Sequence, residues 1–221
     1  MATFVLIHGA ADVAWYWHLT AEELRARGHD VVAMDLPCED ESAGWSEYAD
    51  TVVEAIGDRT ELVVVGQSLG AVTAALVCSR VPAELLVLVA GMIPLPGEPV
   101  TEWFSNPDYA EAARGPDYGD DEVAIFLHDV PPALAAEALE KGRGQAEKPM
   151  VEPWPLDAWP DVPTRYLLCR DDRVFPATWL RQVVPERLGI APDEIDGGHT
   201  PALSRPTALA DRLVAYLAEA A

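Results

Sequence analysis

The sequence of 221 residues has few cysteines and no long apolar run. Its three cysteines, Cys38, Cys78 and Cys169, are too few and too far apart for a disulfide framework. The amino-terminal apolar run is too short for a signal or membrane segment, so we expect a cytoplasmic protein. The five histidines show no metal-ligand spacing with cysteine or acidic residues, and no metal site is predicted.

Basic residues are also scarce. Fifteen Lys and Arg stand against 37 Asp and Glu, which gives a formal net charge of −22. Nucleic acids and anionic membranes bind basic faces, so we expect neither as a partner. A solvated acidic surface is the simplest interpretation of the charge. Half of the residues are hydrophobic, enough for a sizeable core in one domain.

Short apolar runs alternate with helical patterns along the chain. Strands are predicted at residues 4–7, 31–34, 62–66, 85–89, 164–169 and near 191–196. Helices are predicted within about 15–27, from 46, after 68, at 120–128, 132–141, 176–188 and 205–219. We expect Thr20 to open a capping box and Ser46 to cap the next helix. This alternation indicates an α/β fold with a parallel sheet.

The composition changes at Pro94. From 94 to 160 the chain carries many prolines and scattered aromatics but too few apolar runs for an independent domain. We therefore predict a cap or lid inserted at 94–160. The core would comprise two segments, 1–93 and 161–221. The candidates for lining a substrate pocket are Trp103, Phe126, His128 and Trp154, although aromatics in an insertion more often serve packing.

Residues 66–70 read Gly-Gln-Ser-Leu-Gly, after a valine-rich run and before a helical pattern. In a strand–turn–helix context this motif presents Ser68 as a nucleophile, and glycines at both ends avoid Cβ clashes in the sharp turn. The N–H of Leu69 would face the oxygen on which charge develops. A plain turn with an exposed serine is the alternative.

A serine hydroxyl needs a base, and the base needs an orienting acid. His199 lies in a glycine loop after the last short strand, at the same sheet edge as Ser68. The acid should follow the strand that ends at residue 169, where two aspartates stand. We prefer Asp172, four residues before a proline, over Asp171. A structural loop histidine and a helix-capping aspartate are the alternatives.

The loop at residues 8–11, His-Gly-Ala-Ala, follows the first strand and leaves backbone N–H groups uncovered. The N–H of Ala10 is expected to form the oxyanion hole with that of Leu69, and Ala11 is the second choice. We expect His8 to brace this loop rather than to take part in chemistry.

Together these motifs resemble the α/β-hydrolase superfamily. The run at 8–17, with Gly28-His29, is similar to the branch that holds plant methyl esterases, hydroxynitrile lyases and small bacterial esterases. The resemblance implies an α/β-hydrolase fold: a mostly parallel sheet of about six strands, helices on both faces and an inserted helical cap. It also implies the triad roles for Ser68, Asp172 and His199, and the oxyanion roles for Ala10 and Leu69.

Two departures argue against cyanide chemistry. Hydroxynitrile lyases of this branch carry a lysine where this chain has Thr200 and a threonine where it has Gly9. We expect a serine carboxylesterase that acts on a small to medium apolar acyl ester through an acyl-enzyme, with no cofactor. The alternatives are a non-catalytic ligand-binding or regulatory protein, and a cofactor-free lyase that uses the Ser68–His199 pair. No oligomeric state is predicted.

Overall fold

Six short strands form a single sheet in the computed structural model, which describes residues 1–220. They are β1 (Thr3–Ile7), β2 (Asp30–Ala33), β3 (Leu62–Gln67), β4 (Leu85–Val89), β5 (Thr164–Cys169) and β6 (Asp193–Ile195). Their order is β2-β1-β3-β4-β5-β6, and each neighbouring pair is parallel. The prediction of a mostly parallel sheet of about six strands is confirmed.

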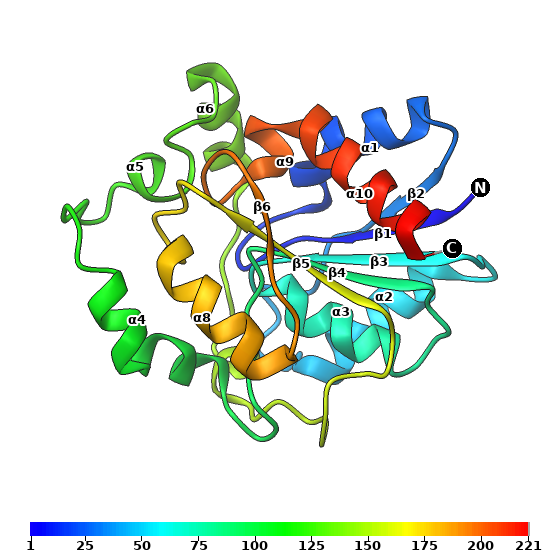
Figure 1. Ribbon diagram of the computed structural model, residues 1–221, viewed down its shortest axis with the longest axis horizontal. Coiled ribbons are helices and arrows are strands. Elements are labelled where there is room, and N and C mark those ends of the chain that lie inside the picture. Colours follow the sequence, from blue (N-terminus) through cyan, green and yellow to red (C-terminus); the bar gives the residue numbers. More distant parts are fainter. Residues whose placement is uncertain (221) are drawn as a thin grey trace.

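The strand order reverses around β1, because β2 lies on one side of it and β3 on the other. The loops after β1 and β3 therefore diverge at the carboxyl ends of adjacent strands, where α/β sheets form their binding crevices. Figure 1 shows the carboxyl end of β1 on the same side of the sheet as the helices of the insertion.

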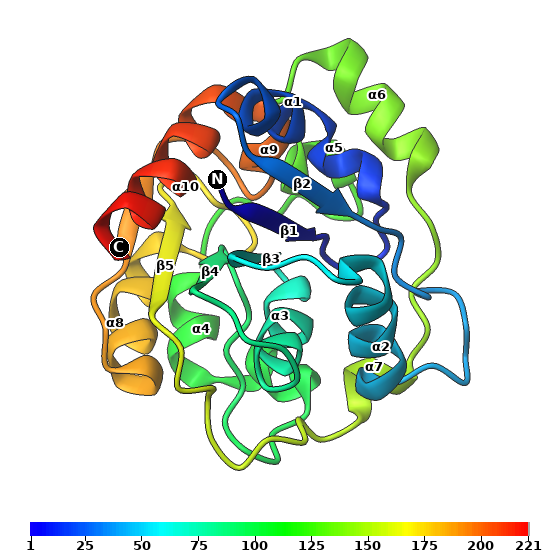
Figure 2. The ribbon, with the colours of Figure 1, turned by 90° about the vertical axis from the view of Figure 1, so that its right-hand side faces the viewer.

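Helices cover both faces of the sheet (Figure 2). One face packs against α1 (His18–Ala26) and α10 (Pro206–Ala220), and the other against α2 (Trp45–Ile56), α3 (Gly70–Cys78) and α8 (Ala177–Leu188). Successive strand residues point to opposite faces, so Phe4 and Leu6 of β1 join one core while Val5 and Ile7 join the other. Burial on both faces explains why the strands are continuous apolar runs.

Two helix starts differ from the prediction. A 3₁₀ turn, η1 (Ala14–Trp17), precedes α1, so Thr20 lies inside the helix, where its hydroxyl donates to the Ala202 carbonyl at 3.3 Å. α2 begins one residue before Ser46, and its first N–H, that of Trp45, donates to the carboxylate of Glu152 at 3.1 Å. A local contact also closes this end of α2, because Glu47 accepts the Gly44 N–H at 2.7 Å.

Segment 94–160 carries five short helical elements. They are η2 (Val100–Ser105), α4 (Pro107–Ala112), α5 (Glu122–Phe126), α6 (Pro132–Lys141) and α7 (Lys148–Val151). Three of them, α4, α5 and α6, lie in Figure 1 on the side of the sheet where β1 ends. The two helical patches expected at 120–128 and 132–141 correspond to α5 and α6. After β6 comes the short helix α9 (Pro201–Ser204).

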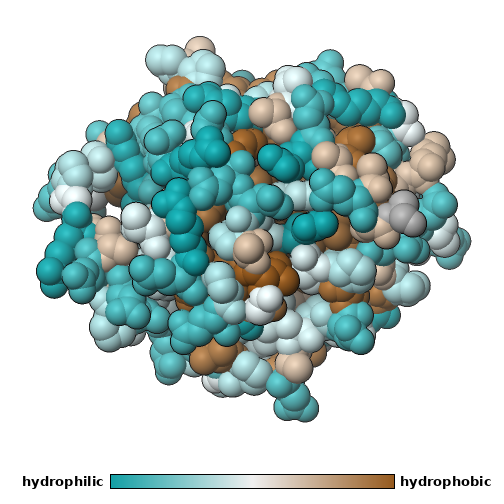
Figure 3. Space-filling view, viewed as in Figure 1, coloured by the Kyte–Doolittle hydropathy of each residue, from teal (hydrophilic) through white to brown (hydrophobic). Residues whose placement is uncertain are grey.

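The surface is mostly hydrophilic on the face drawn in Figure 3, as the acidic composition leads one to expect. Within residues 1–220, no helix combines the length and the apolar character that a membrane crossing requires.

Candidate active site

The turn between β3 and α3 holds Ser68 in a strained conformation, with a φ of +52°. A Cβ on Gly66 would lie 2.6 Å from the Ala71 Cα, and one on Gly70 would collide with the His8 carbonyl. Only glycine fits at both positions, as the sequence indicated. The turn presents the Ser68 side chain at the carboxyl end of β3, next to the first turn of α3.

Three side chains predicted as a triad meet at this edge of the sheet. The Nε2 of His199 lies 3.0 Å from the Ser68 Oγ, and its Nδ1 lies 2.8 Å from Oδ2 of Asp172. Because a carboxylate only accepts hydrogen bonds, Nδ1 carries the proton and Nε2 is left to accept one from the Ser68 hydroxyl. The side chains of Asp172 and His199 are nearly inaccessible to solvent.

Asp172 is oriented by its own loop. Its Oδ1 accepts the N–H groups of Val174 and Phe175 at 2.7 and 3.0 Å, which leaves Oδ2 for the imidazole. The neighbouring Asp171 points elsewhere, and its carboxylate accepts the Gly197 N–H at 3.3 Å. The structure brings Asp172, the aspartate preferred from the sequence, against the histidine.

The loop that carries His199 is held by two side chains for which the sequence analysis predicted no structural role. Gln67, inside the serine motif, donates from Nε2 to the His199 carbonyl at 3.0 Å. The Thr200 hydroxyl donates to the Phe126 carbonyl in α5 at 2.8 Å. Both contacts join residues far apart in sequence, so no local pattern could have revealed them.

The backbone N–H groups of Ala10 and Leu69, one in each loop that flanks Ser68, have no acceptor among residues 1–220. The Ala11 N–H, the second choice for the oxyanion hole, donates to Oε1 of Gln145 at 3.2 Å. The N–H groups of Ala10 and Leu69 are therefore free to donate to a substrate oxygen, whereas that of Ala11 is not.

His8 braces the loop after β1. Its Nε2 accepts the Leu36 N–H at 3.0 Å, so Nδ1 carries the proton and donates to the Gly9 carbonyl at 2.8 Å. Burial lowers the pKa of His8 to about 4, and the ring stays neutral near pH 7.

A cavity of about 480 Å³ opens onto Ser68 and His199. Apolar side chains from the insertion and from α9 form much of its wall: Phe126, Leu127, Ala138, Leu139 and Leu203. Asp12 and Arg143 add charged groups. The sequence analysis missed both, because nothing local distinguishes them from other loop residues.

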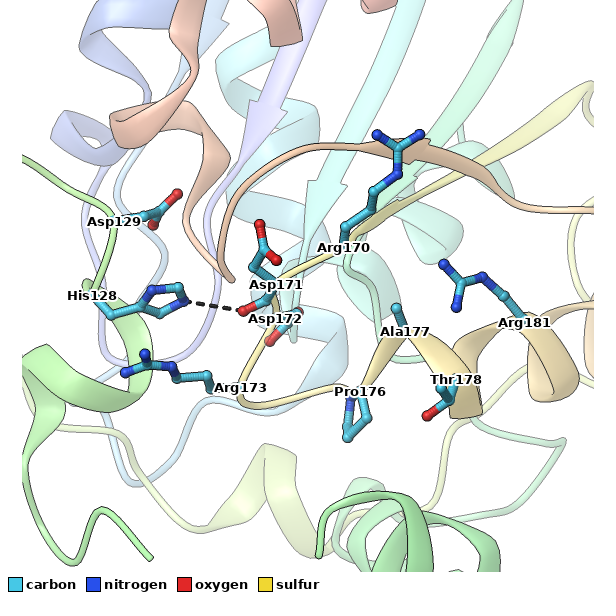
Figure 4. Close-up of a pocket in the computed structure, with 10 residues that line it drawn as sticks. All are labelled: His128, Asp129, Arg170, Asp171, Asp172, Arg173, Pro176, Ala177, Thr178 and Arg181. Atoms are coloured by element: carbon cyan, nitrogen blue, oxygen red, sulfur yellow. Dashed lines mark hydrogen bonds between the residues drawn. The ribbon is translucent and has the colours of Figure 1, made fainter. Parts of the chain in front are cut away.

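A larger hollow, about 630 Å³, is an open basin on the outer side of Asp172 (Figure 4). Its wall includes Arg170 and Arg181, which pair with Glu194, but neither Ser68 nor His199. The smaller cavity is therefore the one that meets the reactive groups.

Of the four predicted pocket residues, Phe126 lines the cavity and the other three do not. Trp103 is fully buried and packs edge-on against Trp179, and Trp154 packs against Trp159. Large apolar rings gain more by filling the interior than by lining a hollow.

The third, His128, lies in the outer basin. Its Nε2 donates to the Asp171 carbonyl at 3.0 Å, the contact drawn as a dashed line in Figure 4. In the part of the chain that the structure describes, no cluster of three or more His, Cys, Asp or Glu could hold a metal ion.

The fold and this geometry define the class of protein. Residues 4–212 match the α/β hydrolase family, and the chain belongs to it. The resemblance stated from the motifs is thereby confirmed, as is the expectation of an enzyme of the α/β-hydrolase fold with esterases among its relatives.

Three known proteins show where the chain stands in the family. Methylesterase 2 of Arabidopsis thaliana is 26% identical over 250 residues, with 96% of this chain and 94% of that protein covered. Norfluorocurarine synthase 1 of Strychnos nux-vomica is 26% identical over 253 residues, covering 93% and 91%. The structure of an extracellular α/β-hydrolase from a Paenibacillus species superposes with a TM-score of 0.81 at 23% identity, covering 98% and 99%.

Proposed function

We propose that the protein is a serine carboxylesterase that hydrolyses small to medium apolar acyl esters through an acyl-enzyme. The observation that carries this proposal is the unbroken path of hydrogen bonds from Asp172 through His199 to Ser68, at the wall of a cavity of about 480 Å³. The named methylesterase relative supports the same reaction.

In the proposed mechanism the Ser68 Oγ attacks the ester carbonyl carbon while Nε2 of His199 takes the hydroxyl proton. Asp172 holds the imidazole in its tautomer and stabilises the imidazolium. The N–H groups of Ala10 and Leu69 donate to the oxyanion, and one such donor is worth about 10²–10³ in rate.

The tetrahedral intermediate then collapses, and His199 returns the proton to the departing alcohol. Water attacks the Ser68 ester with His199 as base, which frees the carboxylic acid and regenerates the serine. The cycle needs no cofactor.

The walls of the cavity support the substrate class. A volume of about 480 Å³ with five apolar side chains suits a short acyl or aryl group rather than a polymer. The charge of −22 supports a small molecule as the partner, without nucleic acid or membrane. Cytoplasmic location stays a prediction of the sequence.

Hydrolysis of p-nitrophenyl acetate and butyrate tests the proposal. Ser68→Ala should lower kcat by about 10⁶-fold and abolish labelling by a fluorophosphonate. Ser46→Ala, at an exposed serine of α2, is the matched control and should change neither. Equal rates for wild type and Ser68→Ala would remove Ser68 from the mechanism. Saturable ligand binding by a wild type that neither turns over nor takes up the label would favour a receptor instead.

A further inference from the structure

The insertion touches the loop after β1 through one short stretch of chain. The Arg143 N–H donates to the Ala11 carbonyl at 2.8 Å, and its guanidinium donates to the Asp12 carbonyl from Nε and Nη2 at 3.1 and 2.7 Å. Gln145 accepts the Ala11 N–H at 3.2 Å. Two consecutive residues of the loop are thus held through their main-chain groups by the insertion.

This stretch is itself tied to the core. Nη2 of Arg143 also donates to the Leu36 carbonyl at 3.0 Å, and Nε2 of Gln145 donates to the Tyr48 hydroxyl at 3.0 Å. The guanidinium therefore bridges the loops after β1 and β2. A brace anchored at its far end resists displacement of the loop that it contacts.

The contacts matter because of where they fall along the main chain. The Gly9 carbonyl and the Ala10 N–H belong to one peptide group, and His8 holds that group by its oxygen. The next peptide group ends in the Ala11 N–H, which Gln145 holds. Ala11 has a φ of +57°, a conformation that alanine adopts only when its surroundings impose it.

We propose that Arg143 and Gln145 are positioning residues for the oxyanion hole: they aim the Ala10 N–H at the oxygen that becomes charged in the transition state. Neither side chain needs to touch substrate for this role. The inference rests on the proposed esterase function, and it makes the insertion part of the catalytic apparatus rather than only a lid.

We expect a loss of kcat with little change in KM. A misaimed N–H donor stabilises the transition state less well but hardly affects binding of the ester. Arg143→Ala should lower kcat by about 10²-fold, the worth of one oxyanion donor. Arg143→Lys keeps the charge but not the fork of donors, so its kcat should lie between that of the wild type and that of Arg143→Ala. Guanidinium chloride at a non-denaturing concentration should restore part of the lost rate in Arg143→Ala, whereas equal sodium chloride should not.

The affinity for a trifluoromethyl ketone is a second measurement, and it would not change if Arg143 had only a structural role. The ketone forms a tetrahedral adduct on a reactive serine, and its oxyanion would need the same N–H donors. Its affinity should fall in parallel with kcat in the Arg143 variants. The matched control is Arg59→Ala, which removes a guanidinium that donates to the carbonyls of Ala55 and Ile56 in α2.

Outcomes separate this inference from the proposed function. If the wild type hydrolyses esters through Ser68 but Arg143→Ala keeps its kcat and its affinity for the ketone, the positioning role is overturned and the esterase stands. If the wild type shows no Ser68-dependent hydrolysis, both are overturned. If Arg143→Ala does not fold, Gln145→Met decides: a kcat about 10-fold lower at constant KM supports the role, and an unchanged kcat refutes it.

Discussion

Ionisation of Asp12 should lower the free energy of unfolding as the pH rises. Asp12→Asn should abolish this pH-dependent loss of stability. The carboxyl lines the cavity beside Ser68, has no cation within ion-pair distance among residues 1–220, and accepts a hydrogen bond only from the Val13 N–H. Burial raises the pKa of Asp12 from its ordinary 3.8 to about 6, against the opposing effects of that N–H and of the Arg143 charge.

The sign follows from linkage. Below about pH 3.8 the carboxyl is neutral in both the folded and the unfolded chain, and its contribution to stability is intact. As the pH rises, the unfolded chain ionises first, and the folded state loses about 3 kcal/mol by the time the pH exceeds 6. Roughly 1.4 kcal/mol of this loss falls between about pH 5 and pH 8.

Urea unfolding followed by tryptophan fluorescence at those two pH values measures the effect. The free energy of unfolding of Asp12→Asn minus that of the wild type should rise by about 1.4 kcal/mol from the lower to the higher pH. The difference cancels titrations shared by both proteins. Asp58→Asn, at an exposed aspartate, should give no such change. A pH-independent difference for Asp12→Asn would refute the argument that burial perturbs this carboxyl.

Two further substitutions test contacts at and away from the site. Glu98→Ala leaves the nearly buried Arg187 guanidinium without its carboxylate, and should lower the free energy of unfolding in urea by about 3 kcal/mol. A loss under about 1 kcal/mol, typical of an exposed pair, would contradict this reading. Gln67→Leu removes the hydrogen bond to the His199 carbonyl and should lower kcat by about 10-fold. The free energy of unfolding of the same variant is measured to separate this effect from a loss of stability. An unchanged kcat would show that the loop carrying His199 keeps its position without this bond.

The sequence by itself determined the features that depend on neighbouring residues. Apolar runs four to six residues long predict buried strands, because a strand covered on both faces has no polar side to show. Gly66 and Gly70 flank Ser68 in a turn that tolerates no Cβ at either end, so the motif can be recognised without coordinates. The positions of strand ends in the chain then led to His199.

Only the tertiary structure decided which groups meet across long stretches of chain. The spacing to Pro176 favoured Asp172 over the adjacent Asp171, but only the packing of the loop turns the Asp172 carboxylate to the histidine and the Asp171 carboxylate to the Gly197 N–H. Arg143 lies 131 residues beyond Asp12 in sequence, and nothing near either predicts their contact. Trp103 became a core residue rather than a pocket wall. Local patterns encode local geometry, whereas these pairings follow from packing that the whole chain settles at once.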